Sequence, residues 1–250
     1  MSDLPVRYFE AHDGAKLAYR EFGEGRPLVL IHGYFSTATV NWVRYGHAAK
    51  IAERGYRVIM PDLRGHGDSA KPHEASAYPP DALADDGFAL LDHLGVTDYD
   101  LGGYSLGART TVRMLVRGAK PARAVVGGMG LSGITATGHR GDFFRRVLTS
   151  LGTFQRGSAE WSAEAFLKTT KGDPVALLGV LDTFVDTSRE ELARITVPTL
   201  VVSGVDDHDN GSAEELATVL PGARHVAIPG NHMTAVANPD LGRAIADFLD

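Results

Sequence analysis

The chain alternates short, continuously apolar runs with segments of helical pattern, and this alternation limits its fold more than any other feature. Such short runs, bounded by glycine, proline or aspartate, are typical of strands buried on both faces of a sheet. Helices placed between them indicate a parallel sheet that is covered on both sides. The expected strands are 27–33, 57–62, 99–105, 123–130, 198–204 and 224–230, and the helical patterns include 79–95, 106–118, 212–222 and the closing residues 241–250.

Two segments depart from this alternation. Residues 6–23 form two alternating runs around Asp13-Gly14, a pair that favours a tight turn, so we expect an antiparallel hairpin at one edge of the sheet. Residues 131–195 contain helical patterns and no strand pattern, and they are too many for a connecting loop. We therefore expect a core made of residues 1–130 and 196–250 and a small helical cap made of residues 131–195.

The composition is that of an ordinary globular protein, because 44% of the 250 residues are hydrophobic and 22% are charged. The net charge is −6 with the two signs interspersed, so nucleic acid is not an expected partner. No apolar run is long enough to cross a bilayer, and the first residues lack a secretory pattern, so a cytoplasmic location is expected. The absence of cysteine excludes disulfides, a cysteine nucleophile and thiolate metal sites.

One serine stands among glycines at the junction of a predicted strand and a predicted helix. Gly103-Tyr104-Ser105-Leu106-Gly107 fits the pattern G-x-S-x-G, in which a sharp turn exposes the seryl oxygen. Glycines two residues to either side let strand and helix approach without Cβ clashes, and the helix N-terminus favours developing negative charge. The segment therefore predicts a nucleophilic serine. The alternative is a glycine-rich turn in which the serine only caps the helix.

A serine hydroxyl needs a base, and the base needs an orienting acid. His232 is the candidate base, because it follows the last predicted strand at a Gly-Asn turn and is expected on a loop there. Asp206, Asp207 and Asp209 follow the preceding strand, and any of them is a candidate acid. The order serine, aspartate, histidine along the chain is that of one known class of serine enzymes.

The segment 32–34, with the sequence HGY, ends the first predicted buried strand. A backbone N–H there and another directly after the serine are suited to bind a developing oxyanion. We assign these roles to the N–H groups of Tyr34 and Leu106.

These segments together resemble the α/β-hydrolase superfamily. The resemblance is carried, in the usual order of that family, by VLIHGY, VIMPDLRGHGDSAKP, GGYSLGAR, LVVSGVDD and GNHM, and it extends from about residue 16 to the end. It implies an α/β fold with a mostly parallel eight-stranded sheet flanked by helices, a helical cap, and a triad of Ser105, Asp207 and His232. Asp207 lies three residues after Gly204, where such enzymes commonly carry the acid, although the loop lacks the usual proline and Ala108 replaces a common glycine.

The resemblance implies a serine hydrolase that cleaves a carboxylic ester or related acyl bond through an acyl-enzyme. Its substrate is expected to be small and hydrophobic, because the predicted cap is rich in apolar and aromatic residues. No cofactor and no metal are expected. The alternatives are a cofactor-free haloperoxidase or perhydrolase, a carbon–carbon bond hydrolase on the same triad, and a non-catalytic receptor for a small ligand. Ser105 disfavours the dehalogenase and epoxide-hydrolase branches, which use an aspartate at this turn.

Overall fold

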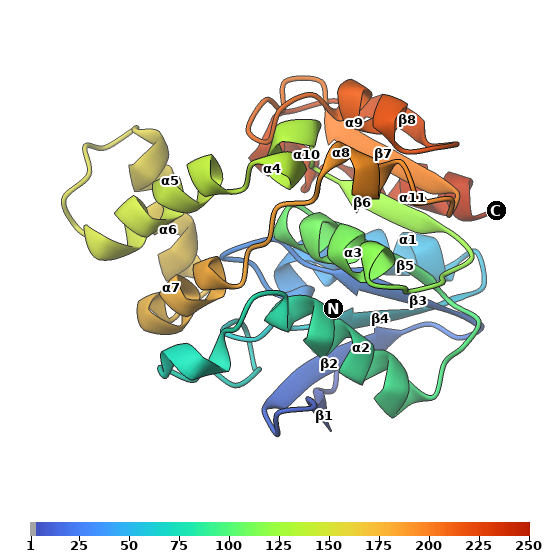
Figure 1. Cartoon of the computed structure of the whole chain (residues 1–250), viewed down its shortest axis with the longest axis horizontal. Coiled ribbons are helices and arrows are strands. Elements are labelled where there is room, and N and C mark those ends of the chain that lie inside the picture. Colours follow the sequence, from blue (N-terminus) through green and yellow to red (C-terminus); the bar gives the residue numbers. More distant parts are fainter. Residues whose placement is uncertain (1–3) are drawn as a thin grey trace.

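A computed structural model describes residues 4–250 and shows one eight-stranded sheet in the order β1-β2-β4-β3-β5-β6-β7-β8 (Figure 1). The strands from β3 onward pair in parallel, whereas β1 with β2 and β2 with β4 are antiparallel. The predicted fold class is therefore confirmed. The strands are β1 (Arg7–Glu10), β2 (Lys16–Phe22), β3 (Arg26–Ile31), β4 (Tyr56–Pro61), β5 (Asp100–Tyr104), β6 (Ala124–Gly127), β7 (Thr199–Gly204) and β8 (Arg224–Ile228).

The predicted hairpin is present at one edge of the sheet. Glu10 of β1 is opposite Lys16 of β2, and the turn closes through hydrogen bonds from Ala11 N to Ala15 O and from Gly14 N to Ala11 O, both of 2.8 Å. Gly14 has a φ of 85°, a conformation that glycine adopts without a steric penalty. The Asp13-Gly14 pair thus lies in the turn that joins β1 and β2, as its sequence indicated.

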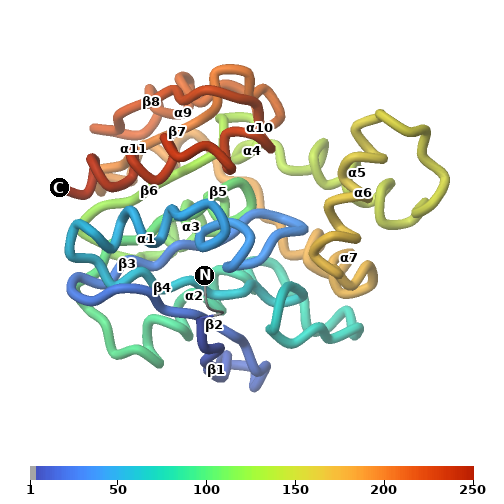
Figure 2. The backbone as a smooth tube through the Cα atoms, turned by 180° about the vertical axis from the view of Figure 1, so that it is seen from behind, coloured from blue at the N-terminus to red at the C-terminus, as the bar shows by residue number. Residues whose placement is uncertain are grey.

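Helices cover both faces of the sheet, as Figures 1 and 2 show from opposite sides. Alternate residues of the buried strands divide between the two faces, so that Leu28 and Leu30 pack toward α1 and α11, and Val29 and Ile31 pack toward α2 and α3. The helices of the core are α1 (His47–Ala52), α2 (Ala82–Leu94), α3 (Leu106–Val116), α9 (Ala213–Val219), α10 (His232–Ala235) and α11 (Pro239–Leu249), with one π-helical turn at Thr39–Val43 and one 3-10 turn at Ala75–Ala77.

Residues 131–195 carry five helices. The helices are α4 (Leu131–Thr135), α5 (Gly138–Thr149), α6 (Ala159–Thr169), α7 (Pro174–Asp182) and α8 (Arg189–Leu192). In both views α5, α6 and α7 lie apart from the sheet, while α4 lies against the rest of the molecule (Figures 1 and 2). Figure 1 shows α8 against the rest of the molecule as well. The division into a core and a cap at residues 131 and 195 stays a prediction.

One expectation about burial was wrong. The run at 224–230 was expected to form a strand buried on both faces, but β8 is the edge strand, and only Ile228 of its five residues is buried. β8 contacts both α9 and α11, but its outer edge pairs with no strand in the described chain, so most of its residues stay accessible to solvent.

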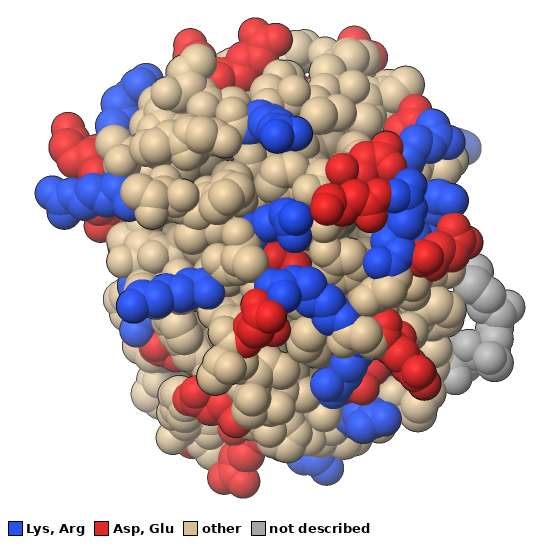
Figure 3. Space-filling model, turned by 90° about the vertical axis from the view of Figure 1, so that its right-hand side faces the viewer, with Lys and Arg blue, Asp and Glu red and all other residues tan. Residues whose placement is uncertain are grey.

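None of the helices in residues 4–250 is long and apolar enough to span a membrane. Basic and acidic side chains are intermingled on the face shown in Figure 3. The absence of a nucleic-acid partner stays a prediction.

A buried carboxylate organises the long loop after β4. Asp62 is 1% exposed and accepts hydrogen bonds from the N–H groups of Ala38 (2.8 Å) and Asp68 (3.0 Å) and from Arg20 Nη1 (3.0 Å). Gly67 has a φ of 49°, and a Cβ there would lie 2.3 Å from the Asp62 carboxylate. Burial alone would raise the pKa of Asp62, but the nearby His32 ring, the amide donors and the charge of Arg20 outweigh it, and the pKa is lowered.

We expect Asp62→Asn to lower the free energy of unfolding at pH 7 by roughly 1–3 kcal/mol, because Arg20 loses its buried counter-ion and keeps only the half-exposed Asp68. The stabilising effect of a lowered pKa is present above the unfolded-state value of about 4 and is lost as the pH falls through the folded-state value. Urea unfolding at a series of pH values from 7 to about 2 should therefore show that the native protein and the variant differ less in their free energy of unfolding as the pH falls. A difference in that free energy that stays constant with pH would contradict this role of Asp62.

Candidate active site

Ser105 occupies a strained turn between β5 and α3. Its φ is 55° and its ψ is −113°, a combination that costs a non-glycine residue roughly 1–3 kcal/mol. The turn is held by a hydrogen bond of 2.8 Å from Ser105 N to Gly127 O at the end of the neighbouring strand β6. The geometry thus places the hydroxyl at the N-terminus of α3, where the helix dipole favours negative charge.

The glycines around Ser105 are required by close packing. A Cβ on Gly103 would lie 2.3 Å from the carbonyl carbon of Gly107, and a Cβ on Gly107 would lie 2.1 Å from Ile31 O of β3. Both distances are far below van der Waals contact. The expectation that Gly103 and Gly107 let the strand and the helix approach without Cβ clashes is therefore confirmed.

His232 approaches Ser105 from the segment after β8. Its Nε2 lies 3.0 Å from Ser105 Oγ. We expected His232 on a loop, but it is the first residue of α10, because the Asn231 side chain caps that helix by accepting from Met233 N and Thr234 N. The Tyr104 hydroxyl donates to the His232 carbonyl at 2.7 Å, so the residue preceding the serine also holds the backbone of the histidine.

Of the three candidate acids, Asp207 contacts the histidine. Its Oδ2 lies 2.9 Å from His232 Nδ1, and its side chain is only 3% exposed. Asp206 is exposed to solvent, and Asp209 pairs with Arg140 at 2.7 Å. The structure therefore brings Ser105, His232 and Asp207 into one hydrogen-bonded series, although they come from three segments that follow different strands.

The segment His32-Gly33-Tyr34 lies against the serine, since a Cβ on Gly33 would be 3.4 Å from Ser105 Cβ. Two buried side chains hold its backbone: Asn41 Oδ1 accepts from Gly33 N at 3.0 Å, and His32 Nδ1 lies 2.7 Å from Gly33 O. Burial lowers the pKa of His32, so its ring is neutral, with Nδ1 donating to that carbonyl and Nε2 accepting from Leu63 N at 3.0 Å.

The Tyr34 N–H belongs to the same peptide unit as the Gly33 carbonyl. In a trans peptide these two groups point in opposite directions, so holding the carbonyl toward His32 turns the N–H away from His32. Leu106 is the first residue of α3, where N–H groups have no intrahelical acceptor. Within residues 4–250, neither N–H donates to a protein acceptor.

Aromatic residues of the α5–α7 region pack over this segment. The Phe144 ring meets the Tyr34 ring at 4.7 Å between centroids and the Phe35 ring at 5.2 Å, both edge to face. The Tyr34 hydroxyl donates to Leu177 O of α7 at 2.6 Å. The apolar residues of 131–195 therefore reach the neighbourhood of Ser105, as their composition indicated.

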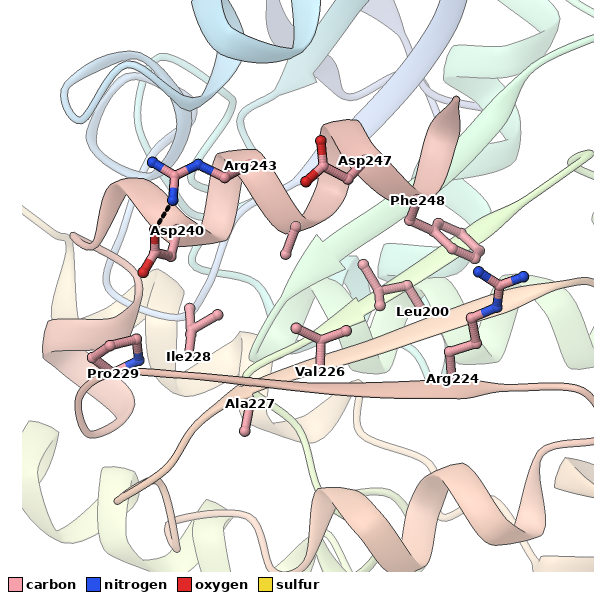
Figure 4. Close-up of a pocket in the computed structure, with 11 residues that line it drawn as sticks. Leu200, Arg224, Val226, Ala227, Ile228, Pro229, Asp240, Arg243, Asp247 and Phe248 are labelled. Carbon is pink, nitrogen blue, oxygen red and sulfur yellow. Dashed lines mark hydrogen bonds and ion pairs between the residues drawn. The ribbon is translucent and has the colours of Figure 1, made fainter.

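A groove of about 390 Å³ lies away from the serine, between the edge strand β8 and α11. It is lined by Val226, Ile228 and Phe248 among others (Figure 4). None of Ser105, Asp207 and His232 lines it. We place the candidate site at the hydrogen-bonded series rather than in this groove, because a nucleophile, a base and an acid meet in that series.

Sequence reasoning missed two polar residues around the serine turn, namely Asn41 and Arg109. Asn41 lies in a single π-helical turn that has no apolar periodicity, and Arg109 occurs in a helical pattern where a surface position is the ordinary expectation for an arginine. In the described part of the chain, no three His, Cys, Asp or Glu side chains are grouped so that they could hold a metal ion.

We expect Gly107→Ala to lower the free energy of unfolding by about 1–3 kcal/mol, because the new methyl group would overlap Ile31 O. Gly141→Ala is the matched control, since a Cβ at this position of α5 meets nothing within 4 Å, and it should leave stability unchanged or raise it by about 0.5–1 kcal/mol. Urea unfolding of both variants measures the difference. Equal stabilities of the two variants would show that the close approach of β3 and α3 is not required.

Known proteins with similar sequence and structure agree with this arrangement. A family model described as alpha/beta hydrolase fold matches residues 26–132. The chain is 28% identical to a non-heme haloperoxidase of Rhodococcus erythropolis, over 97% of this chain and 99% of that protein. A solved hydrolase from Pseudomonas aeruginosa superposes with a TM-score of 0.80 at 26% identity, covering 98% of each chain. An esterase from Thermogutta terrifontis, at 23% identity and 98% coverage of each chain, shares the fold with a TM-score of 0.78.

Proposed function

We propose that this chain, which has the α/β-hydrolase fold, hydrolyses a carboxylic ester or related acyl bond of a small molecule, with Ser105 as the nucleophile. The observation that carries the proposal is the series Ser105 Oγ, His232 Nε2 at 3.0 Å, and Asp207 Oδ2 at 2.9 Å from the other ring nitrogen. A strained turn that presents a hydroxyl to an imidazole has an evident use in nucleophilic catalysis.

The series defines the proton movements of the first step. Asp207 accepts the hydrogen bond of His232 Nδ1–H, so Nε2 is left as the acceptor for the Ser105 hydroxyl proton. His232 takes that proton as Ser105 Oγ attacks the carbonyl carbon of the ester. The Asp207 carboxylate, which is 3% exposed, stabilises the imidazolium that forms.

The tetrahedral intermediate carries its negative charge on the former carbonyl oxygen. In this proposal the N–H groups of Tyr34 and Leu106 donate to that oxygen, the first from the segment held by His32 and Asn41 and the second from the start of α3. Both donors are fixed before the substrate arrives, so no reorganisation is needed during the reaction, and each is worth about 100- to 1000-fold in rate.

The second half of the reaction releases the acid. His232 gives its proton to the leaving alcohol, and then takes a proton from a water molecule that attacks the acyl group on Ser105. The second tetrahedral intermediate collapses, the acid departs, and the hydroxyl of Ser105 is restored.

Ser105→Ala should reduce hydrolysis of p-nitrophenyl butyrate by roughly 10³-fold or more, because no other group can take over the nucleophilic attack. Release of p-nitrophenol at pH 7.5 measures the rate, and thermal unfolding serves as the control for an intact fold. Turnover that survives in a folded variant would remove Ser105 from the mechanism.

The acid is tested by comparing two neighbouring substitutions. Asp207→Asn should lower kcat by about 10⁴-fold, because an amide cannot stabilise the imidazolium and favours the wrong tautomer of His232. Asp206→Asn, which changes an exposed side chain by the same atoms, should stay within about threefold of the native rate. The reverse order of effects would assign the acid to Asp206.

A second function is favoured by one observation, the similarity to the non-heme haloperoxidase over 97% of the chain. In that function hydrogen peroxide, rather than water, attacks the acyl group on Ser105 and releases a peracid. Halogenation of monochlorodimedone in the presence of acetate, bromide and hydrogen peroxide detects the peracid. A halogenation rate that exceeds ester hydrolysis and is lost in Ser105→Ala would make the peracid reaction the main activity.

A further inference from the structure

Arg109 lies one helical turn beyond Ser105 on the same face of α3. Its N–H donates to Ser105 O at 3.0 Å, and side chains four residues apart on a helix are neighbours. Because side chains on a helix lean toward its N-terminus, the side chain of Arg109 leans back toward the turn that carries Ser105. The residue is 5% exposed.

The guanidinium of Arg109 has few protein partners for its five donors. Its Nε donates to Gly133 O at 3.0 Å, and its plane lies 4.3 Å from the centre of the Phe184 ring. Neither Nη atom bonds to a protein acceptor within residues 4–250, and no carboxylate of that range forms an ion pair with it. The charge of Arg109 therefore lacks a counter-ion, and its Nη atoms, which are not among the fully buried unpaired atoms, are still accessible to a small molecule.

Arg113 and Arg117, the two arginines further along α3 and at its C-terminal end, both have carboxylate partners. Arg113 makes a bidentate pair with Asp81 at 2.8 and 2.7 Å, and Arg117 pairs with Asp85 at 2.6 Å. The most buried of the three is the one without a carboxylate. Burying an unpaired charge is costly, so a guanidinium kept in this state is suited to receive an anion from outside the chain.

Arg109 remains protonated at neutral pH. Burial, together with the nearby charge of Arg140, lowers its pKa to about 10. Asp186 is the carboxylate that partly opposes this, but it accepts hydrogen bonds from Thr137 N and Thr137 Oγ1, at 2.8 and 2.7 Å, and not from Arg109. A full positive charge is thus available one turn from the serine.

Aromatic contacts connect both arginines to the segment beside Ser105. Phe184, on which Arg109 stacks, meets Tyr34 at 6.5 Å between centroids. Arg140 of α5 lies 4.9 Å from the centre of the Phe144 ring, which itself contacts Tyr34. Arg140 is already paired with Asp209, so Arg109 is the cation that an incoming anion would engage.

A small cavity of about 20 Å³ borders Arg109. It is lined by Leu106, Thr110 and Phe184, and by Asp81 and Arg113, which neutralise each other. Its volume is on the scale of one water molecule, which is also the scale of one carboxylate oxygen.

We propose that Arg109 forms an anion subsite of the active site and that the substrate is an ester or lactone bearing a second, free carboxylate. This inference rests on the proposed function, with the scissile carbonyl at Ser105. One helical turn separates the two residues by about 6 Å along α3, so the carboxylate stands a few bonds from the reacting carbonyl. Esters of short dicarboxylic acids have this spacing.

The matched substrates are mono-p-nitrophenyl glutarate and p-nitrophenyl valerate, which have acyl chains of equal length and differ in a terminal carboxylate. We expect the native protein to prefer the glutarate ester in kcat/KM. Arg109→Met should lower kcat/KM for the glutarate ester by about 10- to 100-fold, as expected for the loss of a charge-assisted hydrogen bond, and change the valerate ester by less than about threefold. Arg117→Met, the same change two turns further along the helix, should alter neither value.

An equal loss on both esters in Arg109→Met would show that the residue only links α3 to α4, and a native protein without preference for the glutarate ester would also overturn the subsite. Turnover that survives Ser105→Ala would instead overturn the proposed function, so the two failures are distinguishable.

A second measurement needs no variant of Arg109. Glutaramate and valeramide are amides of equal chain length that differ in a terminal carboxylate, and each is tested as a competitive inhibitor of p-nitrophenyl butyrate hydrolysis by the native protein. We expect glutaramate to inhibit at least about tenfold more tightly than valeramide, because only glutaramate carries a carboxylate for Arg109. Equal inhibition constants would overturn the subsite even if Arg109→Met does not fold.

Discussion

The approach of β3, β5 and α3 to within backbone contact is the constraint on which the rest of the site depends. Gly107 lies so near Ile31 O that no side chain fits, and this proximity forces the sharp turn that gives Ser105 its positive φ. The same turn sets the place of the other groups. Tyr104 holds the His232 backbone through its hydroxyl, and Gly33 lies against the serine Cβ. Strain at one residue is therefore maintained by the packing of the whole sheet and helix layer.

Neutral, negative and positive side chains occupy different positions around Ser105. His32 is buried and uncharged, and it serves as a hydrogen-bonding link between Gly33 and Leu63. The negative charge of Asp207 is placed behind His232, on the side away from Ser105. The positive charge of Arg109 lies on the helix that begins at the serine. An ester with a remote carboxylate would meet this distribution with its carbonyl near N–H donors and its anion near a cation.

The sequence was sufficient for much of this arrangement, because the relevant signals are local. Apolar runs located the strands, Asp13-Gly14 located the hairpin, and Gly103 and Gly107 located the serine turn. Features that depend on distant partners were not predictable. The edge position of β8 follows from strand order. Residue patterns alone left Asp206, Asp207 and Asp209 open, and only the family resemblance favoured Asp207, because the choice depends on where His232 points. α1 and α10 are too short to show a period, and the lack of a carboxylate beside Arg109 is a property of its neighbours.

The groove between β8 and α11 has a practical consequence for ligand discovery. A search that starts from open hollows would direct compounds to this groove, beside Val226 and Phe248, and a binder found there would not contact Ser105, Asp207 or His232. Covalent probes that report on the occupancy of Ser105 avoid this error, because they select for chemistry rather than volume. In this molecule the open groove and the hydrogen-bonded serine lie in different places, and screening must begin from the serine.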